Sequence, residues 1–487
     1  MGIVLKQSVN NTIITYIGFA IGAINTLFLY TRFLTDEYYG LVGVILSASA
    51  VLMPLLAFGV PNTLVKYYSG FKDQEVTDGF LTLMLLLPLL LILPIAAVSY
   101  FAYDAIGSFL AKENPIVKGY VWYIFLIGMA MAYFEVFYAW ARVQMKSVFG
   151  NFMKEVFVRI GITLLLIFVY FKWITVDTFL IWLVVLYMLR MVVMKIYAYR
   201  LRMPVISFKF PKNSKVILQY SALIILGGSA AVVLLEVDKV MINQFIKIEN
   251  VAYYSVAIFI ATVISVPSRA MHQIAYPLTA EILNKNDTAG LKNLYQRSSL
   301  TLFIVSGLIY ILIIVNLKDL YLLLPKEYGN GFGIVFLIGL AKVYDSILGN
   351  NNAILYNSDY YKALLVMGVF LAFMTIIFNL WLIPAYGLLG AAIASFSALF
   401  IYNTVKLIFV KIRFGILPFT IEMFKAMGVL VLLSIGFYFI EFSFHPILNI
   451  IIKSVLIGFI YLWILFRFKL SEDVYGVIAK YLKRKSK

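Results

Sequence analysis

The chain has 487 residues, of which 63% are hydrophobic and 13% are charged, and its formal net charge is +17. Soluble domains carry about 25% charged residues, so this composition excludes an ordinary soluble domain and indicates a polytopic membrane protein. The apolar runs continue over about 20 residues, as in membrane-spanning helices, whereas barrel strands would alternate apolar and polar residues. The sequence has no cysteine and only 2 histidines, which excludes disulfides, thiol nucleophiles and a histidine-cluster metal site.

We therefore predict an all-α fold with about fourteen transmembrane helices. The predicted spans are 10–30, 39–61, 80–103, 118–141, 152–172, 177–199, 217–246, 251–271, 299–317, 331–356, 361–383, 387–410, 424–440 and 449–468. The first run is long enough to span and is not followed by a small-residue cleavage site, so no cleavable signal is expected. The loops are short and leave no room for a large soluble domain on either side of the membrane.

Basic residues are distributed unequally between the two sides of these spans. With the N-terminus inside, the inside loops and flanking helix ends hold 28 Lys and Arg residues, against 8 outside. Because cytoplasmic loops are enriched in Lys and Arg, both termini are predicted to be cytoplasmic. The net charge thus reflects loops and tail rather than a nucleic-acid surface, and residues 480–487 are expected to contact anionic lipid.

The most basic loop, from Arg200 to Lys215, falls between the sixth and seventh predicted spans. We predict an N-terminal six-helix lobe, a basic cytoplasmic linker, a C-terminal six-helix lobe, two additional helices and a basic cytoplasmic tail. Their bounds are 1–199, 200–216, 217–413, 414–470 and 471–487. A shift of 212 residues places 33–37 over 245–249 at equivalent positions of the two halves, which is consistent with the repeats common in transporters.

Segment 233–257, near the midpoint, places charged side chains at the end of an apolar helix. Ionisable side chains within a span are energetically expensive and mark functional sites by default. Glu236, Lys239 and Asn243 are spaced i, i+3, i+7 and share one helix face. Asp238 lies about 200° around the helix from Glu236, so the two cannot face one narrow cavity. A purely structural Glu236–Lys239 pair is the alternative to a functional site.

Four short segments, taken together, carry a family resemblance. They are TRFLTDEYYG (31–40), FGVPNTLVKYYSG (58–70), DK (238–239) with ENVAYYSVA (249–257), and IPAYGLLGAAIA (383–394). In this order they resemble the polysaccharide flippases of the multidrug/oligosaccharidyl-lipid/polysaccharide exporter superfamily. The resemblance covers roughly residues 8–410. The lipid II branch of that family has cavity arginines in its first two helices, whereas this chain has only Arg32 at the end of its first span.

The resemblance implies two six-helix lobes around a central cavity. It also implies translocation of undecaprenyl-diphosphate-linked oligosaccharide from the inner to the outer leaflet of the bacterial inner membrane, as in the assembly of O-antigen and other lipopolysaccharide. The expected partners are this lipid-linked oligosaccharide, membrane lipids and the polysaccharide polymerase machinery, with no nucleic acid. No catalytic residue, cofactor or metal site is expected, and coupling to an H⁺ or Na⁺ gradient would supply the driving force.

A lipid diphosphate requires cations in a wet cavity, because Arg offers paired donors and Lys a point charge to phosphate. The predicted substrate-binding residues are Arg159, Arg190, Lys239, Arg269 and Lys342. Arg159 follows Glu155 by four residues, so an intrahelical ion pair is its structural alternative. Arg190 has no acid within four residues on its own helix, which leaves Glu135 or the substrate as its partner. Snorkelling to the headgroups is the alternative for Arg269.

Directional flipping also requires a driver, and an intramembrane carboxylate that binds H⁺ or Na⁺ can bias one conformational state. The predicted ion-coupling residues are Asp238, Glu236, Glu135 and Asp345. Asp238 is the first choice because it lies in a segment shared with the family. Lys342 and Asp345 are three residues apart, so a mutual ion pair is the alternative there, and the polar stripe continues to Gly349 and Asn352.

Two other functions remain open at the level of sequence. A multidrug cation antiporter of the same superfamily should have a pocket dominated by acids, whereas Arg and Lys are at least as numerous here within spans. A membrane glycosyltransferase or polymerase should have an acidic motif in an outward loop, which Asp36 and Glu37 provide, but also a sizeable outer domain, which this chain lacks. The prediction is thus a transporter rather than an enzyme.

Overall fold

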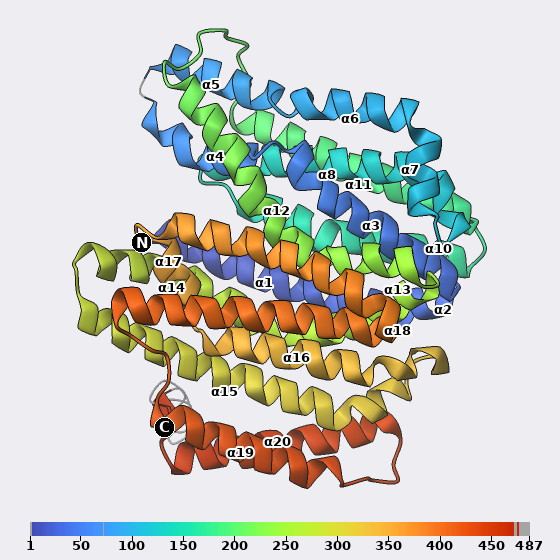
Figure 1. The fold of residues 1–487 in the computed structure, drawn as a ribbon, viewed down its shortest axis with the longest axis vertical. Coiled ribbons are helices and arrows are strands. Elements are labelled where there is room, and N and C mark those ends of the chain that lie inside the picture. Colours follow the sequence, from blue (N-terminus) through green and yellow to red (C-terminus); the bar gives the residue numbers. More distant parts are fainter. Residues whose placement is uncertain (1, 72, 472–474, 477–487) are drawn as a thin grey trace. The chain divides into compact units, whose positions relative to one another are not determined.

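The computed structural model describes residues 2–71, 73–471 and 475–476, and the regular elements within them are all helical (Figure 1). Helices lie over each of the predicted spans, and 11 helical segments of the described chain are long and apolar enough to cross a membrane. The chain is therefore an all-helical, multi-span membrane protein, as its composition predicts. Residues 480–487, predicted to contact lipid, lie outside the described residues.

The first compact unit comprises Met1–Ser255 and Ala372–Ala391. Its helices are α1 (Gly2–Ile24), α2 (Tyr30–Phe33), α3 (Asp36–Leu56), α4 (Val60–Tyr67), α5 (Gln74–Leu86), α6 (Leu89–Phe101), α7 (Tyr103–Leu110), α8 (Val121–Val143), α9 (Val148–Phe152), α10 (Val158–Tyr170), α11 (Val176–Leu201), α12 (Ser214–Phe245), the first half of α13 (Glu249–Thr262) and the middle of α18 (Tyr361–Phe414). Two π-helical turns, η1 (Asn25–Leu29) and η4 (Met153–Phe157), interrupt otherwise α-helical segments. The core of this unit surrounds Trp140, Phe134 and Phe80.

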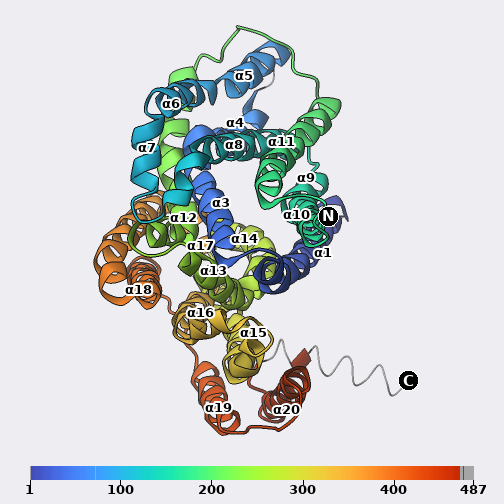
Figure 2. The ribbon, with the colours of Figure 1, turned by 90° about the vertical axis from the view of Figure 1, so that its right-hand side faces the viewer.

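The second compact unit comprises Val256–Leu371 and Ala392–Lys487. Its helices are the rest of α13, α14 (Val266–Asn284), α15 (Thr288–Tyr321), α16 (Phe332–Ile347), α17 (Asn351–Tyr356), the two ends of α18, α19 (Ile421–Tyr438) and α20 (Pro446–Arg467). Helices α19 and α20 form a hairpin beside α15 (Figure 2). Their shared core includes Tyr461 and Leu430, and Leu430 packs against Gly307, where a Cβ would lie 2.6 Å from it.

The family-like segment 58–70 begins at a sharp break between α3 and α4, and the backbone conformation of this break requires glycine. Phe58 and Gly59 both have positive φ, at 49° and 65°. A Cβ on Gly59 would lie 2.3 Å from the carbonyl oxygen of Ser221 in α12, so the close approach of the two backbones requires glycine. The hydroxyl groups of Thr63 and Ser221 lie 2.7 Å apart and join α4 to α12.

A second family-like segment, 383–394, contains the break that divides α18 into two helices. Gly387 has φ 57° and ψ −134°, a conformation that is essentially restricted to glycine. The break agrees with the two separate spans predicted at 361–383 and 387–410. One continuous helix of 54 residues would be far longer than a membrane requires.

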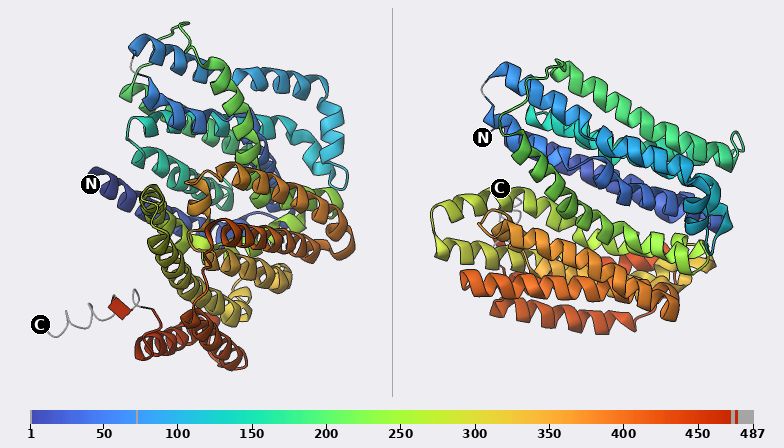
Figure 3. Two further views of the ribbon diagram at one scale, coloured as in Figure 1. Left: turned by 60° about the vertical axis from the view of Figure 1, so that its left-hand side comes forward. Right: turned by 45° about the horizontal axis from the view of Figure 1, so that its top comes forward.

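The basic linker is docked against α5 rather than loose (Figure 3). Arg202 donates a hydrogen bond to Asp78 at 2.7 Å, and the Ser207 amide donates to Thr82 at 3.1 Å. Burial would lower the pKa of Arg202, but its hydrogen bonds to Asp78 and Tyr68 raise that pKa above its usual value, so the guanidinium remains charged. These contacts fix the path of the chain from α11 to α12 within the first unit.

Candidate functional site

A cavity of about 250 Å³ in the first unit brings three ionisable side chains together. Glu135 and Arg142 come from α8, and Lys154 comes from the π-helical turn η4. Residues of the family-like segment 58–70, among them Asn62, also line the cavity. One segment that carries the family resemblance therefore contributes directly to a charged cavity.

The carboxylate of Glu135 lies 2.6 Å from Lys154 Nζ, so its ion partner is Lys154 rather than Arg190. Arg142 places its guanidinium 4.9 Å from the ring centroid of Tyr138. Glu135 and Arg142 are seven residues apart on α8 and thus share a helix face. That spacing is a sequence signal for Arg142, which is not among the predicted substrate-binding residues.

Arg190 is buried in α11, with only 7% of its surface exposed. Its guanidinium carbon lies 4.2 Å from the ring centroid of Phe134 and 4.9 Å from that of Tyr187. Within the described chain, no carboxylate lies at ion-pair distance from it. Aromatic faces attract a cation, but they only partly offset the cost of burying one without a counter-ion. Arg190 is therefore the strongest local source of uncompensated positive charge in this region.

Arg159 forms the intrahelical ion pair with Glu155 that its spacing predicts, at 3.2 Å. Its side chain lies against α1, where a Cβ on Gly22 would approach the guanidinium Nε to 3.2 Å. Asn25, in the π-helical turn η1, donates a hydrogen bond to the Arg159 carbonyl at 2.8 Å. Such π-turns occur frequently at functional sites, and here η4 contains Glu155 while η1 contacts Arg159.

These side chains form one electrostatic neighbourhood, which we call the basic cluster. Its members are Arg142, Lys154, Arg159, Arg190, Glu135 and Glu155. Arg190 lies within electrostatic range of both carboxylates, and the Tyr187 hydroxyl lies within range of both Arg159 and Arg190. Four cations against two carboxylates leave an excess of positive charge, so the cluster favours an anion over a cation.

Asp238 occupies a separate, buried site in the first unit and is only 4% exposed. Its carboxylate accepts a hydrogen bond from the Tyr254 hydroxyl at 2.5 Å and from Asn379 Nδ2 at 2.6 Å. Tyr254 belongs to the family-like segment 249–257, so the two parts of that motif are in direct contact. Asn379, from α18, is 141 residues away, and the sequence contains no local signal for its role.

Glu236 and Lys239 form the ion pair that their spacing predicts, with Nζ 2.9 Å from Oε2. Ser47 of α3 donates a second hydrogen bond to Glu236 at 2.7 Å. Asn243, on the same face, is fully buried and donates to the Leu110 carbonyl. Asp238 binds different partners, as the angular separation from Glu236 predicts. No group of three His, Asp or Glu side chains within the described ranges is arranged to hold a metal ion.

In the second unit, Asp345 of α16 faces Lys406 of α18, with Oδ1 3.8 Å from Nζ. Lys406 is 1% exposed and donates a hydrogen bond to Asn352 Oδ1 at 3.0 Å. Its ammonium also lies 4.3 Å from the ring centroid of Tyr402. The predicted polar stripe from Asp345 to Asn352 is thus held together by Lys406, a cation that is not among the predicted site residues.

The two remaining predicted cations, Arg269 and Lys342, also lie in the second unit. Arg269, near the start of α14, is exposed, and Lys342 of α16 is half-buried. Ser268 precedes Arg269, and Ser346 lies one helical turn after Lys342. The hydroxyl groups of these two serines are 3.2 Å apart and join α14 to α16. The structure therefore distributes the predicted site residues over both units, with the basic cluster and Asp238 in the first.

Comparisons with known proteins place this geometry in context. A family model described as "Polysaccharide biosynthesis protein" matches residues 4–283. No curated protein sequence matches the chain. Among solved structures, the chain is similar to lipid II flippase MurJ in an inward closed conformation, with a TM-score of 0.73 and 15% identity over 94% of this chain and 99% of that one.

Two transporter structures show the same fold. An inward-facing multidrug resistance MATE family transporter of the MOP superfamily gives a TM-score of 0.64 at 15% identity, over 84% of this chain and 98% of that one. A MOP superfamily transporter from Pyrococcus furiosus gives 0.55 at 15% identity, over 85% and 97%. These likenesses extend over the great majority of each chain and identify the fold.

Proposed function

Because the chain belongs to the polysaccharide biosynthesis protein family, a family of MOP-fold transporters and not of enzymes, we propose that it is a flippase for undecaprenyl-diphosphate-linked oligosaccharide. In this proposal it moves the lipid-linked oligosaccharide from the cytoplasmic to the outer leaflet by alternating access. The product would supply the assembly of a cell-surface polysaccharide of the O-antigen or lipopolysaccharide type.

The proposed architecture is the one that the sequence predicts. Fourteen spans would form two six-helix lobes, 1–199 and 217–413, around a central cavity, with two additional helices at 414–470. Both termini would lie on the cytoplasmic side of the bacterial inner membrane. The unequal distribution of Lys and Arg supports this orientation.

The observation that carries the proposal is the charge of the basic cluster. A diphosphate diester has about two negative charges, and Arg and Lys bind such groups through charge-assisted hydrogen bonds. The cluster has four cations and two carboxylates, and the excess matches this charge. Lys239, Arg269 and Lys342 would add contacts at other stages of translocation.

Asp238 is the proposed site of ion coupling, with Glu236, Glu135 and Asp345 as further candidates. A buried carboxylate with two short hydrogen bonds can change its partners when it binds H⁺ or Na⁺. Loss or exchange of the hydrogen bonds with Tyr254 and Asn379 would alter the packing of α12 against α13 and α18. Occupancy of the site would in this way bias one conformational state.

The test is to deplete the protein and locate the lipid-linked oligosaccharide with a membrane-impermeant reagent in intact and lysed spheroplasts. We expect completed oligosaccharide to accumulate in a form that reacts only after lysis. Arg190→Ala should fail to restore outward transport. Arg200→Ala, an exposed arginine on the same helix, is the matched control and should restore it.

Two outcomes would contradict the proposal. If completed oligosaccharide still reaches the outer face in depleted cells, the protein does not flip that lipid. A multidrug cation antiporter, which shares the fold, would then be tested by drug efflux, although the excess of cations in the basic cluster opposes cation binding. Accumulation of unpolymerised units on the outer face would instead indicate the polymerase alternative.

A further inference from the structure

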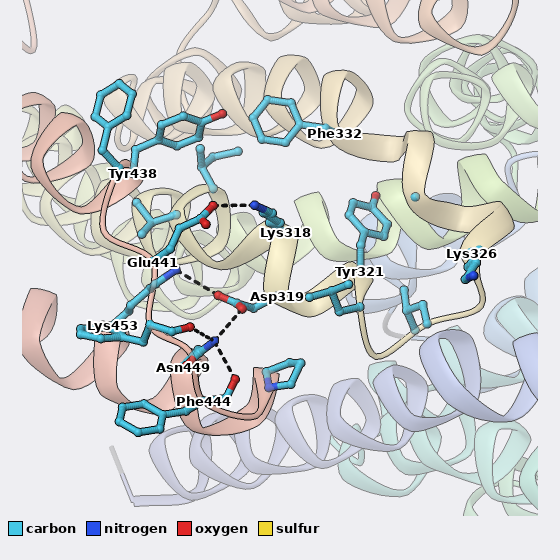
Figure 4. A pocket seen from close by; sticks show the side chains of 18 residues that line it. Lys318, Asp319, Tyr321, Lys326, Phe332, Tyr438, Glu441, Phe444, Asn449 and Lys453 are labelled. Atoms are coloured by element: carbon cyan, nitrogen blue, oxygen red, sulfur yellow. Dashed lines mark hydrogen bonds and ion pairs between the residues drawn. The ribbon is translucent and has the colours of Figure 1, made fainter.

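A second cavity, of about 930 Å³, opens in the second unit between the C-terminal end of α15 and the α19–α20 hairpin (Figure 4). The 3-10 turn η6 (Lys326–Gly331) and the loop before α20 complete its wall. None of the predicted site residues lines this cavity. The charge distribution of the sequence predicts that it faces the outer side of the membrane.

The floor of the cavity is a buried ion pair. Lys453 Nζ of α20 lies 3.0 Å from Asp319 Oδ2 of α15, and both residues are at least nine-tenths buried. Asn449 donates from Nδ2 to Asp319 Oδ1 at 3.0 Å and to the carbonyls of Phe442 and Phe444. This floor is rigid because every member is held by at least one partner from another element or from the loop.

The cavity carries one more cation than anions. Lys318 and Glu441 form an exposed ion pair at its mouth, and Lys326 adds another ammonium at the side (Figure 4). Together with Asp319 and Lys453, these residues amount to three ammonium groups against two carboxylates. The cavity therefore suits a ligand with a single negative charge.

The remaining wall is apolar. It includes Ile314, Leu322, Phe332 and Phe439, of which Phe439 is 76% exposed and Phe332 is 40% exposed. Such a surface next to membrane-spanning helices suits the upper part of an acyl chain, while aromatic rings are favoured at the depth of the headgroups. The lining thus changes from charged to apolar within one cavity.

We propose that this cavity binds a phospholipid with a single negative charge, such as phosphatidylglycerol. Lys326 and Lys318 bind its phosphate, and the aromatic wall holds the chain. One negative charge matches the excess of one cation, whereas a lipid diphosphate would carry about twice that charge. The bound lipid joins α15 to the α19–α20 hairpin.

The experiment measures thermal unfolding of the purified full chain in detergent with added phosphatidylglycerol or phosphatidylcholine, and lipid binding by native mass spectrometry. A ligand that binds only the folded state raises Tm, so phosphatidylglycerol should raise it by at least about 2 °C and phosphatidylcholine should not. The double variant Lys318→Gln, Lys326→Gln should weaken phosphatidylglycerol binding about tenfold, as expected when two charged contacts with the phosphate are lost.

Lys326→Gln alone serves as the fold control, because Lys326 is exposed and the Tm without lipid should be unchanged. Lys247→Gln removes an exposed lysine of the first unit and should leave lipid binding unchanged. Equal effects of the two lipids, no lipid effect, or full binding by the double variant would each overturn the proposal. Displacement of phosphatidylglycerol by an undecaprenyl-diphosphate sugar at lower concentration would identify a substrate site instead.

Discussion

At the scale of single residues, the buried carboxylate of Asp238 depends on hydrogen-bond donors from two other helices. It accepts a hydrogen bond from Tyr254 at Oδ2, at 2.5 Å, and one from Asn379 at Oδ1, at 2.6 Å, so the loss of either oxygen removes one of these bonds. A donor left unpaired in a buried site costs much more than an average hydrogen bond contributes. The residue is therefore structural as well as a candidate for ion coupling.

We expect Asp238→Asn to destabilise the protein by about 1–3 kcal/mol, because the amide nitrogen that replaces one carboxylate oxygen cannot accept the hydrogen bond which that oxygen accepted. Thermal unfolding of the purified variant measures the effect. Asp104→Asn is the matched control, since its carboxylate is exposed and its partner at 3.5 Å, Lys118, is exposed as well. The control should lose less than about 1 kcal/mol, and an equal loss in both variants would contradict this account.

Pairing within one helix could be predicted at this scale, but pairing between helices could not. The Glu155–Arg159 and Glu236–Lys239 pairs follow from spacing alone. Lys154 meets Glu135, and Asn379 meets Asp238, only because distant segments pack together. Arg142, Lys154 and Lys406 are not among the predicted site residues, because residues near the ends of spans cannot be assigned to a cavity from hydropathy.

At the scale of helices, the break in α18 depends on one glycine. A Cβ on Gly387 would meet no atom within 4 Å, so any cost of substitution comes from the backbone conformation alone. We expect Gly387→Ala to destabilise the protein by about 1–3 kcal/mol.

The control is Gly458→Ala in α20, where a Cβ also meets nothing within 4 Å but the backbone is helical. This change should be neutral or stabilising by about 0.5–1 kcal/mol, because alanine restricts the unfolded chain. Thermal unfolding of both variants in detergent compares them directly. A similar response from the two would show that the conformation of Gly387 is not the cause.

The attachment of the α19–α20 hairpin depends in part on the Asp319–Lys453 pair. Lys453→Leu should cost about 3–5 kcal/mol, because it leaves a buried carboxylate without its counter-ion. The double variant Asp319→Leu, Lys453→Leu should recover much of that loss, since no charge remains unpaired. Unfolding of the two variants against the wild type measures the coupling, and purely additive losses would contradict it.

At the scale of the whole molecule, the absence of cysteine makes the predicted orientation simple to test. Single cysteines can be introduced without a background and labelled with a membrane-impermeant maleimide in intact spheroplasts. We expect Lys112→Cys and Lys326→Cys to be labelled, and Lys209→Cys in the docked linker to be labelled only after lysis. Labelling of Lys209→Cys in intact spheroplasts would reverse the proposed topology.

The positions of the membrane-spanning helices could be predicted because each span is a long, continuous apolar run of sequence. Apolar runs of about 20 residues place the helices without any knowledge of their neighbours. Breaks inside those runs were less visible: the turn between α16 and α17 falls within one predicted span, 331–356. Such breaks depend on local side-chain contacts, for instance the approach of Ser298 and Ser299 to Gly349, which composition does not reveal.

The two π-helical turns near Arg159 also change the direction in which the side chains that follow them point. A π-turn holds one residue more than the α-helical turn that it replaces, so it shifts the phase of everything after it by about 100°. Deleting one residue from η4 would restore a regular helix and rotate Arg159 away from Gly22 of α1. The side that this helix presents is therefore set by an inserted residue, which a helical wheel drawn through the segment would misplace.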